Sequence, residues 1–114
     1  PNICSLRAVA AVLLGYHPGF FPQYIRPDKN GKLEPRHARE YAPRDIHVLF
    51  EAAGLEIIQL ETGPYTANHN AEHNWVKHLM HRYELSDQLR GEAIYAIGRK
   101  TGSPTNRYPA SLYS

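Results

Sequence analysis

The stretch Ala93-Ile94-Tyr95-Ala96-Ile97 decides the fold of this chain. None of these five side chains carries a charge, and such a run is typical of a strand that is covered on both faces of a sheet. A fully apolar strand with only one neighbour would leave a hydrophobic edge unpaired. The sequence therefore predicts that this strand lies inside a sheet, with a neighbouring strand on each side.

The chain offers only one other clear strand, from Leu55 to Glu61. Its apolar residues Ile57 and Ile58 point to opposite faces, and polar residues stand on either side of them, which indicates an edge position. Two strands alone form a sheet that is marginally stable at best. We therefore expect an α/β fold whose sheet is incomplete within these residues.

Three helices are expected around these strands. The first is apolar nearly all round from Ile3 to Leu14, with Asn2 as its N-cap and Gly15 at its end. The second begins at Pro43 and ends at Gly54, and the third covers residues 71–83 with one apolar face. From residue 101 onward the chain is polar, and we expect a disordered tail.

Composition restricts the classes of function. The 114 residues fit one domain, and 13 Lys and Arg against 11 Asp and Glu give a net charge of +2, too small for a dedicated nucleic-acid binder. The longest apolar stretch is far shorter than a membrane span, so no membrane partner is expected. The single cysteine, Cys4, excludes an intramolecular disulfide and favours a cytoplasmic protein.

Four segments of the chain occur in the order found in one enzyme family. They are Pro1-Asn2, Arg36-His37-Ala38-Arg39-Glu40-Tyr41-Ala42-Pro43, Leu49 to Ile57, and Leu89-Arg90-Gly91-Glu92-Ala93-Ile94-Tyr95-Ala96-Ile97-Gly98-Arg99-Lys100. In this order they resemble the C-terminal half of a class I S-adenosylmethionine-dependent methyltransferase of the small-molecule type. They cover most of residues 1–100.

The resemblance implies the C-terminal portion of a Rossmann-like sheet with flanking helices. In that family the last strand is antiparallel and lies between the fifth and sixth strands, and the acceptor of the methyl group would be a small molecule. The glycine-rich turn of the family has no counterpart, because no Gly-x-Gly occurs here. We therefore expect residues 1–100 to lack the cofactor-binding half, and S-adenosylmethionine to bind only the complete parent protein.

The resemblance also implies the site residues. His37 would be the catalytic base, with a polar loop residue as the alternative interpretation. Arg36 and Arg39 would bind the substrate or form a salt-bridged face, and Tyr41 would bind or simply pack. Two further groups would contact substrate, namely Asn2 at the end of the fifth strand and a lid of Phe20, Phe21 and Tyr24, which could equally fill the core.

Two other functions remain open from the sequence. A methyltransferase fragment would pair with its missing N-terminal half, whereas a noncatalytic interaction module would complete its sheet by pairing with another chain. A metal site is the second, because His69-Asn70-Ala71-Glu72-His73 fits the H-x-x-E-H pattern of zinc proteases. No evident third ligand follows this motif, and a five-residue pattern arises easily by chance in a chain with seven histidines.

Overall fold

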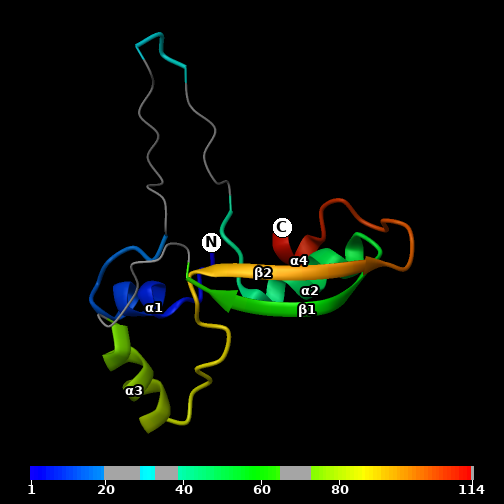
Figure 1. Cartoon of the computed structure of the whole chain (residues 1–114). Coiled ribbons are helices and arrows are strands. Elements are labelled where there is room, and N and C mark those ends of the chain that lie inside the picture. The colour runs from blue at the N-terminus through cyan, green and yellow to red at the C-terminus, as the bar shows by residue number, and fades with distance from the viewer. Residues whose placement is uncertain (20–28, 33–38, 65–72, 114) are drawn as a thin grey trace.

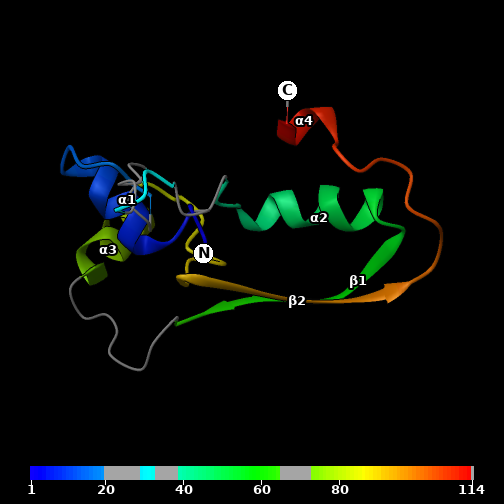
Figure 2. The same ribbon diagram turned by 90° about the horizontal axis from the view of Figure 1, so that it is seen from above.

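The computed structural model describes residues 1–19, 29–32, 39–64 and 73–113. Over these residues the chain forms a small α/β fold with four helices and two antiparallel strands (Figure 1). Helices α1 and α3 lie together at one end of the sheet, and α2 and α4 lie over its length (Figures 1 and 2). None of the helices found in these ranges is long and apolar enough to cross a bilayer.

The sheet consists of β1, Leu55–Gly63, and β2, Ala93–Lys100. The two strands pair from Leu55 opposite Lys100 to Gly63 opposite Ala93, with a bulge between Ile57 and Gln59. This confirms the antiparallel strand pair. Within the described part of the chain β2 has β1 as its only strand neighbour, so its second edge is open.

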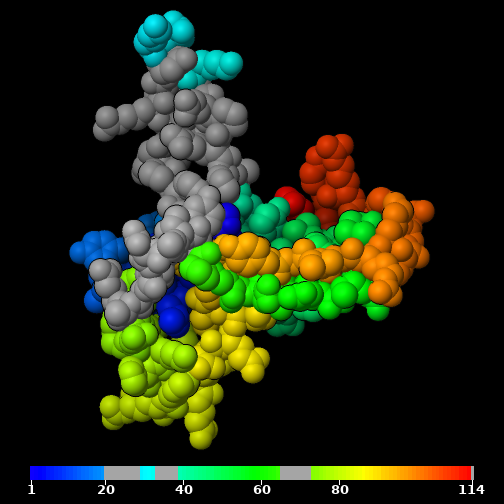
Figure 3. All heavy atoms as spheres, viewed as in Figure 1, coloured from blue at the N-terminus to red at the C-terminus, as the bar shows by residue number. Residues whose placement is uncertain are grey.

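One face of this sheet is covered and the other is not. Helix α2, Pro43–Ala52, packs against the first face (Figure 2). On the other face Ile58, Tyr95 and Ile97 are 49%, 49% and 57% exposed, and Figure 3 shows β2 in orange along the molecular surface. An apolar strand exposed on one face and along one edge fits a sheet that continues beyond the described residues.

Helix α1, Leu6–Leu13, begins later than the sequence suggests. The prediction that Asn2 caps it is wrong, because the N-cap is Ser5, whose Oγ accepts the N–H of Ala8 at 3.1 Å. The Asn2 amide instead donates to two carbonyl groups that precede β2, and its Oδ1 accepts the N–H of Cys4, which lies before the helix. The end is as predicted, with Gly15 in the left-handed region at φ +83°.

Helix α2 follows its sequence signals closely. Pro43 is its first residue, and Gly54, at φ +73°, follows its last turn. Ala42 has no side chain that can cap the helix, but the carboxylate of Asp45 compensates by accepting the Ala42 N–H at 2.9 Å. This is one of the two hydrogen bonds of a capping box, and the other, which needs a side-chain acceptor at the N-cap, cannot form with alanine.

The small core lies between α1 and α3, Asn74–Arg82. Val76 and Met80 pack there against Ala10 and are 0% and 4% exposed. The predicted apolar face of α3 is therefore confirmed in its centre only, because its outer aromatic residues, Trp75 and Tyr83, stay 42% and 62% exposed.

The buried position of Val76 gives a prediction. Truncating Val76→Ala should lower the free energy of unfolding by about 2 kcal/mol, because it removes buried methyl groups and leaves a cavity. The matched control is Val12→Ala on α1, where the side chain is 57% exposed and the change should stay within about 0.5 kcal/mol. Urea unfolding measures both, and equal losses would contradict this location of the core.

The tail differs from its expected disorder. Residues 101–113 form what we call the C-terminal strap, which ends in the short helix α4, Ala110–Tyr113, and buries Leu112 to 6% exposure. The strap returns over α2 (Figure 2). Composition alone indicated a polar tail, but backbone hydrogen bonds of the strap to the end of α2 hold it in place.

Candidate functional site

Asn2 joins the start of the chain to the start of β2. Its amide Nδ2 donates to the carbonyls of Leu89 and Gly91 at 2.9 and 2.7 Å, and its Oδ1 accepts the N–H of Cys4 at 3.0 Å. The backbone N–H of Asn2 donates to the carbonyl of Glu92 at 2.7 Å. With 2% exposure, Asn2 is a buried polar side chain whose donors and acceptor are satisfied inside the protein.

A cavity of about 430 Å³ lies next to this junction, at the carboxyl end of β1. Its walls come from the start of α1, the end of β1, one residue of α3 and the loop before β2: Leu6, Arg7, Thr62, Gly63, Pro64, Lys77, Asp87, Leu89, Arg90, Gly91 and Glu92. In open α/β sheets, ligands bind outside the carboxyl ends of the strands. The cavity has the position and the size of a small-molecule site.

Close backbone contact shapes the cavity at Gly91. A Cβ on this residue would lie 2.5 Å from the backbone nitrogen of Gly63, so only glycine fits there without displacing β1. Its N–H also donates to the hydroxyl of Thr62 at 3.0 Å. The end of β1 and the loop before β2 are thereby held together at the cavity wall.

Arg90 secures the loop that closes the cavity. Its guanidinium donates to the Ser86 carbonyl, with Nη2 at 2.9 Å, and to the Cys4 carbonyl, with Nη1 at 3.0 Å. Leu89 lies in the left-handed region at φ 56°, a conformation that costs a non-glycine residue about 1 kcal/mol. The bonds of Arg90 and of the Asn2 amide hold the loop in this shape.

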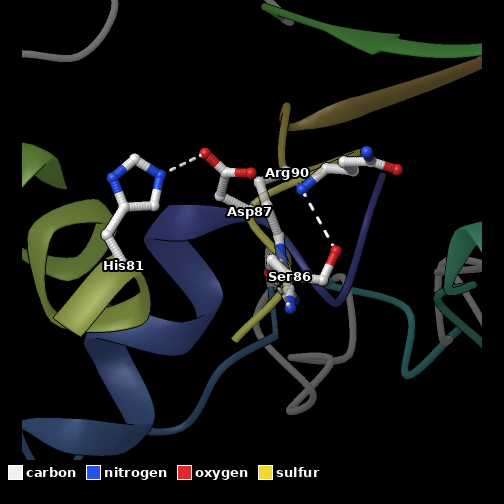
Figure 4. A network of polar contacts seen from close by, with 5 residues as sticks. His81, Ser86, Asp87 and Arg90 are labelled. Carbon is white, nitrogen blue, oxygen red and sulfur yellow. Dashed lines mark hydrogen bonds and ion pairs between the residues drawn. The ribbon is translucent and has the colours of Figure 1, made fainter. Parts of the chain in front are cut away.

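A carboxylate in the cavity wall is bonded to an imidazole. Nε2 of His81, on α3, lies 2.5 Å from Oδ2 of Asp87, which itself lines the cavity (Figure 4). The hydrogen bond from His81 lowers the pKa of Asp87 below its ordinary value of 3.8. This contact fixes the orientation of the His81 imidazole relative to the cavity wall.

The lowered pKa of Asp87 gives a second prediction. In the folded protein the Asp87 carboxylate keeps its charge below pH 3.8. The contact with His81 therefore stabilises the fold at every pH above the pKa that Asp87 has in the unfolded chain. This stabilisation is lost as the pH falls through the lower pKa that Asp87 has in the folded protein. His81→Gln should raise the pKa of Asp87, followed by carboxyl ¹³C NMR. The exposed His78→Gln on the same helix is the control. An unchanged Asp87 pKa in His81→Gln would contradict the contact.

The structure brings together three of the residues predicted for the site. Asn2 forms an isolated parallel bridge with Tyr41, and the guanidinium carbon of Arg39 lies 5.6 Å from the centre of the Tyr41 ring. The other predicted residues, Phe20, Phe21, Tyr24, Arg36 and His37, lie outside the described residues. Their roles stay predictions.

Contacts with the C-terminal strap occupy Arg39 and Tyr41. Arg39 Nη1 donates to the carbonyl of Leu112, and Nη2 forms an ion pair with Asp45 at 3.6 Å. The hydroxyls of Tyr41 and Tyr113 share a hydrogen bond of 2.7 Å. This bond, ahead of burial, raises the pKa of Tyr41 above its ordinary value, so its hydroxyl keeps its proton at neutral pH.

Most of the H-x-x-E-H motif lies outside the described residues. Of its residues only His73 is described, and it takes the N-cap position of α3 without a side-chain cap bond. No group of three or more His, Cys, Asp or Glu side chains that could hold a metal is found in the parts of the chain that were placed.

Comparison of the chain with family models, curated proteins and solved structures finds no match.

Sequence reasoning missed the pair of His81 and Asp87. No helical spacing connects residues that lie six positions apart across a helix end. The only signal was a histidine in the last turn of a helix with an aspartate in the loop that follows.

Proposed function

We propose that this chain is the C-terminal part of a class I S-adenosylmethionine-dependent methyltransferase that transfers a methyl group to a small-molecule acceptor. The observation that carries the proposal is the position of Asn2 beside the start of β2. Its N–H donates to Glu92, the residue just before the strand, while the strand edge beyond is open. A strand leading into Pro1 would run antiparallel along that edge.

The strand arrangement supports this proposal. In the family that the sequence resembles, the last strand is antiparallel to the sixth and has the fifth on its other side. Here β2 is antiparallel to β1, and the open apolar edge of β2 is the place for a further strand. We infer that β2 is a central strand of a Rossmann-like sheet in the complete protein.

The acceptor fits the cavity at the carboxyl end of β1. A hydroxyl acceptor must lose its proton when its oxygen takes the methyl group. His37 is the predicted base, and among the described residues the carboxylate of Asp87, which is bonded to His81, lines the cavity. The charged side chains of the lining are of both signs, Arg7, Lys77 and Arg90 beside Asp87 and Glu92, which favours a polar acceptor.

The residues of this chain do not by themselves fit S-adenosylmethionine. The chain contains no Gly-x-Gly, and N–H groups at the start of α1 already have partners, since Leu6 donates to Arg90 and Ala8 to Ser5. In the complete protein the cofactor would bind to the part of the domain that precedes Pro1 in the sequence. We assign no step of the reaction to it.

The test uses the reading frame upstream of Pro1. We expect it to encode a strand followed by Gly-x-Gly. The longer product, meaning the protein translated from the upstream frame together with this chain, should bind S-adenosylmethionine in calorimetry, whereas this chain alone should not. Binding by this chain alone, or no binding by the longer product, would contradict the proposal. A longer product that binds no cofactor but pairs with another chain would instead support the noncatalytic interaction module.

The variant Ile97→Lys makes the test more specific. Ile97 is 57% exposed on the uncovered face, so in this chain the change should alter the free energy of unfolding by less than about 0.5 kcal/mol. In the longer product the same lysine would be buried, and cofactor binding should be lost. The control Arg99→Gln, on the exposed end of the same strand, should leave binding intact.

A further inference from the structure

A second cavity, separate from the candidate site, lies between α2 and the C-terminal strap. It has a volume of about 500 Å³. Leu49, Phe50 and Leu55 form its floor together with two alanines, and Pro104 and Pro109 belong to the strap that covers it. Small-molecule sites are mostly apolar cavities of this size with a few polar groups, and this cavity matches that description.

The strap that covers the cavity is fastened at both ends. Near its start, the N–H groups of Thr101 and Gly102 donate to the Gly54 carbonyl at 3.0 and 3.1 Å, and Thr105 donates to Ala52 at 2.8 Å. At its far end Tyr113 is bonded to Tyr41. Because both ends of the strap are held by hydrogen bonds, the strap has a fixed position over α2, and the cavity between them is a defined feature of the fold.

The lining of this cavity has few polar side chains, and the charge that it carries is positive. Among the described residues that line it, Arg107 carries the only formal charge. Its guanidinium carbon lies 5.3 Å from the centre of the Tyr108 ring, and no described carboxylate forms an ion pair with it. A cation beside an apolar cavity is complementary to an apolar molecule with an anionic end.

We propose that this cavity binds a small apolar molecule that carries one carboxylate, such as a medium-chain fatty acid. The hydrocarbon part occupies the space beside Leu49 and Phe50, and the carboxylate accepts hydrogen bonds from Arg107. The cavity is lined by residues of α2, Ala53, the first residue of β1 and the strap, and it shares no residue with the candidate site, so this inference does not depend on the proposed methyl transfer.

Amide NMR of the full chain tests the proposal with two probes of equal length and opposite charge. Octanoate should shift the amide signals of Ala52, Ala53 and Asn106 in a saturable titration, and octylammonium should bind about ten-fold more weakly. Equal affinity for the two probes would overturn the proposal, as would octanoate shifts elsewhere in the chain.

Two arginine variants separate a specific contact from general attraction to a basic protein. Arg107→Gln should weaken octanoate binding about ten-fold and remove the preference over octylammonium, because it removes the charged donor. Arg99→Gln removes the same charge from exposed β2, outside the cavity, and should leave the affinity unchanged. Equal weakening by both variants would show charge attraction only and would overturn the proposal.

Discussion

Asn2→Ala should lower the free energy of unfolding by about 3 kcal/mol, since it removes three hydrogen bonds of a buried amide at about 1 kcal/mol each. The lost partners are the carbonyls of Leu89 and Gly91 and the N–H of Cys4. Urea unfolding followed by circular dichroism measures the change. The loss is a large part of the stability of a small domain.

Asn74→Ala is the control for this prediction. Asn74 is exposed in the first turn of α3, and the substitution should change the free energy of unfolding by less than about 0.5 kcal/mol. Similar losses in both variants would mean that Asn2 does not hold the start of the chain to the loop before β2.

Gly54→Ala should cost about 3 kcal/mol, the sum of backbone strain at φ +73° and the loss of two strap hydrogen bonds. An added Cβ would lie 2.5 Å from the carbonyl oxygen of Gly102, so the strap has to move away. That movement breaks the bonds that Thr101 and Gly102 donate to the Gly54 carbonyl.

Gly15→Ala separates the two contributions. Gly15 has a similar φ of +83°, but nothing lies within 4 Å of its added Cβ, so only the strain of about 1 kcal/mol applies. Thermal unfolding of the two variants should therefore differ by about 2 kcal/mol. If they lose the same stability, the strap is not seated on Gly54.

Local sequence signals predicted the elements whose causes are local. The apolar spacing of α2, between Pro43 and Gly54, gave its position almost to the residue. The uncharged run of β2 predicted a strand, and among the described residues this strand has β1 on one side and no strand on the other. Apolar periodicity and the placement of glycine determine helices and strands through contacts within a few residues, so these elements can be predicted from the sequence without knowledge of the fold.

Contacts between distant residues explain what the sequence could not show. Asn2 is a good N-cap by residue type, yet its amide bonds to Leu89, 87 residues away. The polar tail indicated disorder, but hydrogen bonds to Ala52 and Gly54 order it. For the candidate site, proximity of His81 to Asp87 follows from the path of the loop after α3, which no spacing in the sequence encodes.

The central claim is that β2 is an inner strand whose second neighbour precedes Pro1. Amide hydrogen exchange tests it most directly, because alternate N–H groups of β2 point to the open edge. In this chain we predict that these amides exchange quickly while the alternate set, bonded to β1, is protected. In the longer polypeptide both sets should be protected. Protection of both sets in this chain alone, or fast exchange at the edge in the longer polypeptide, would contradict the claim.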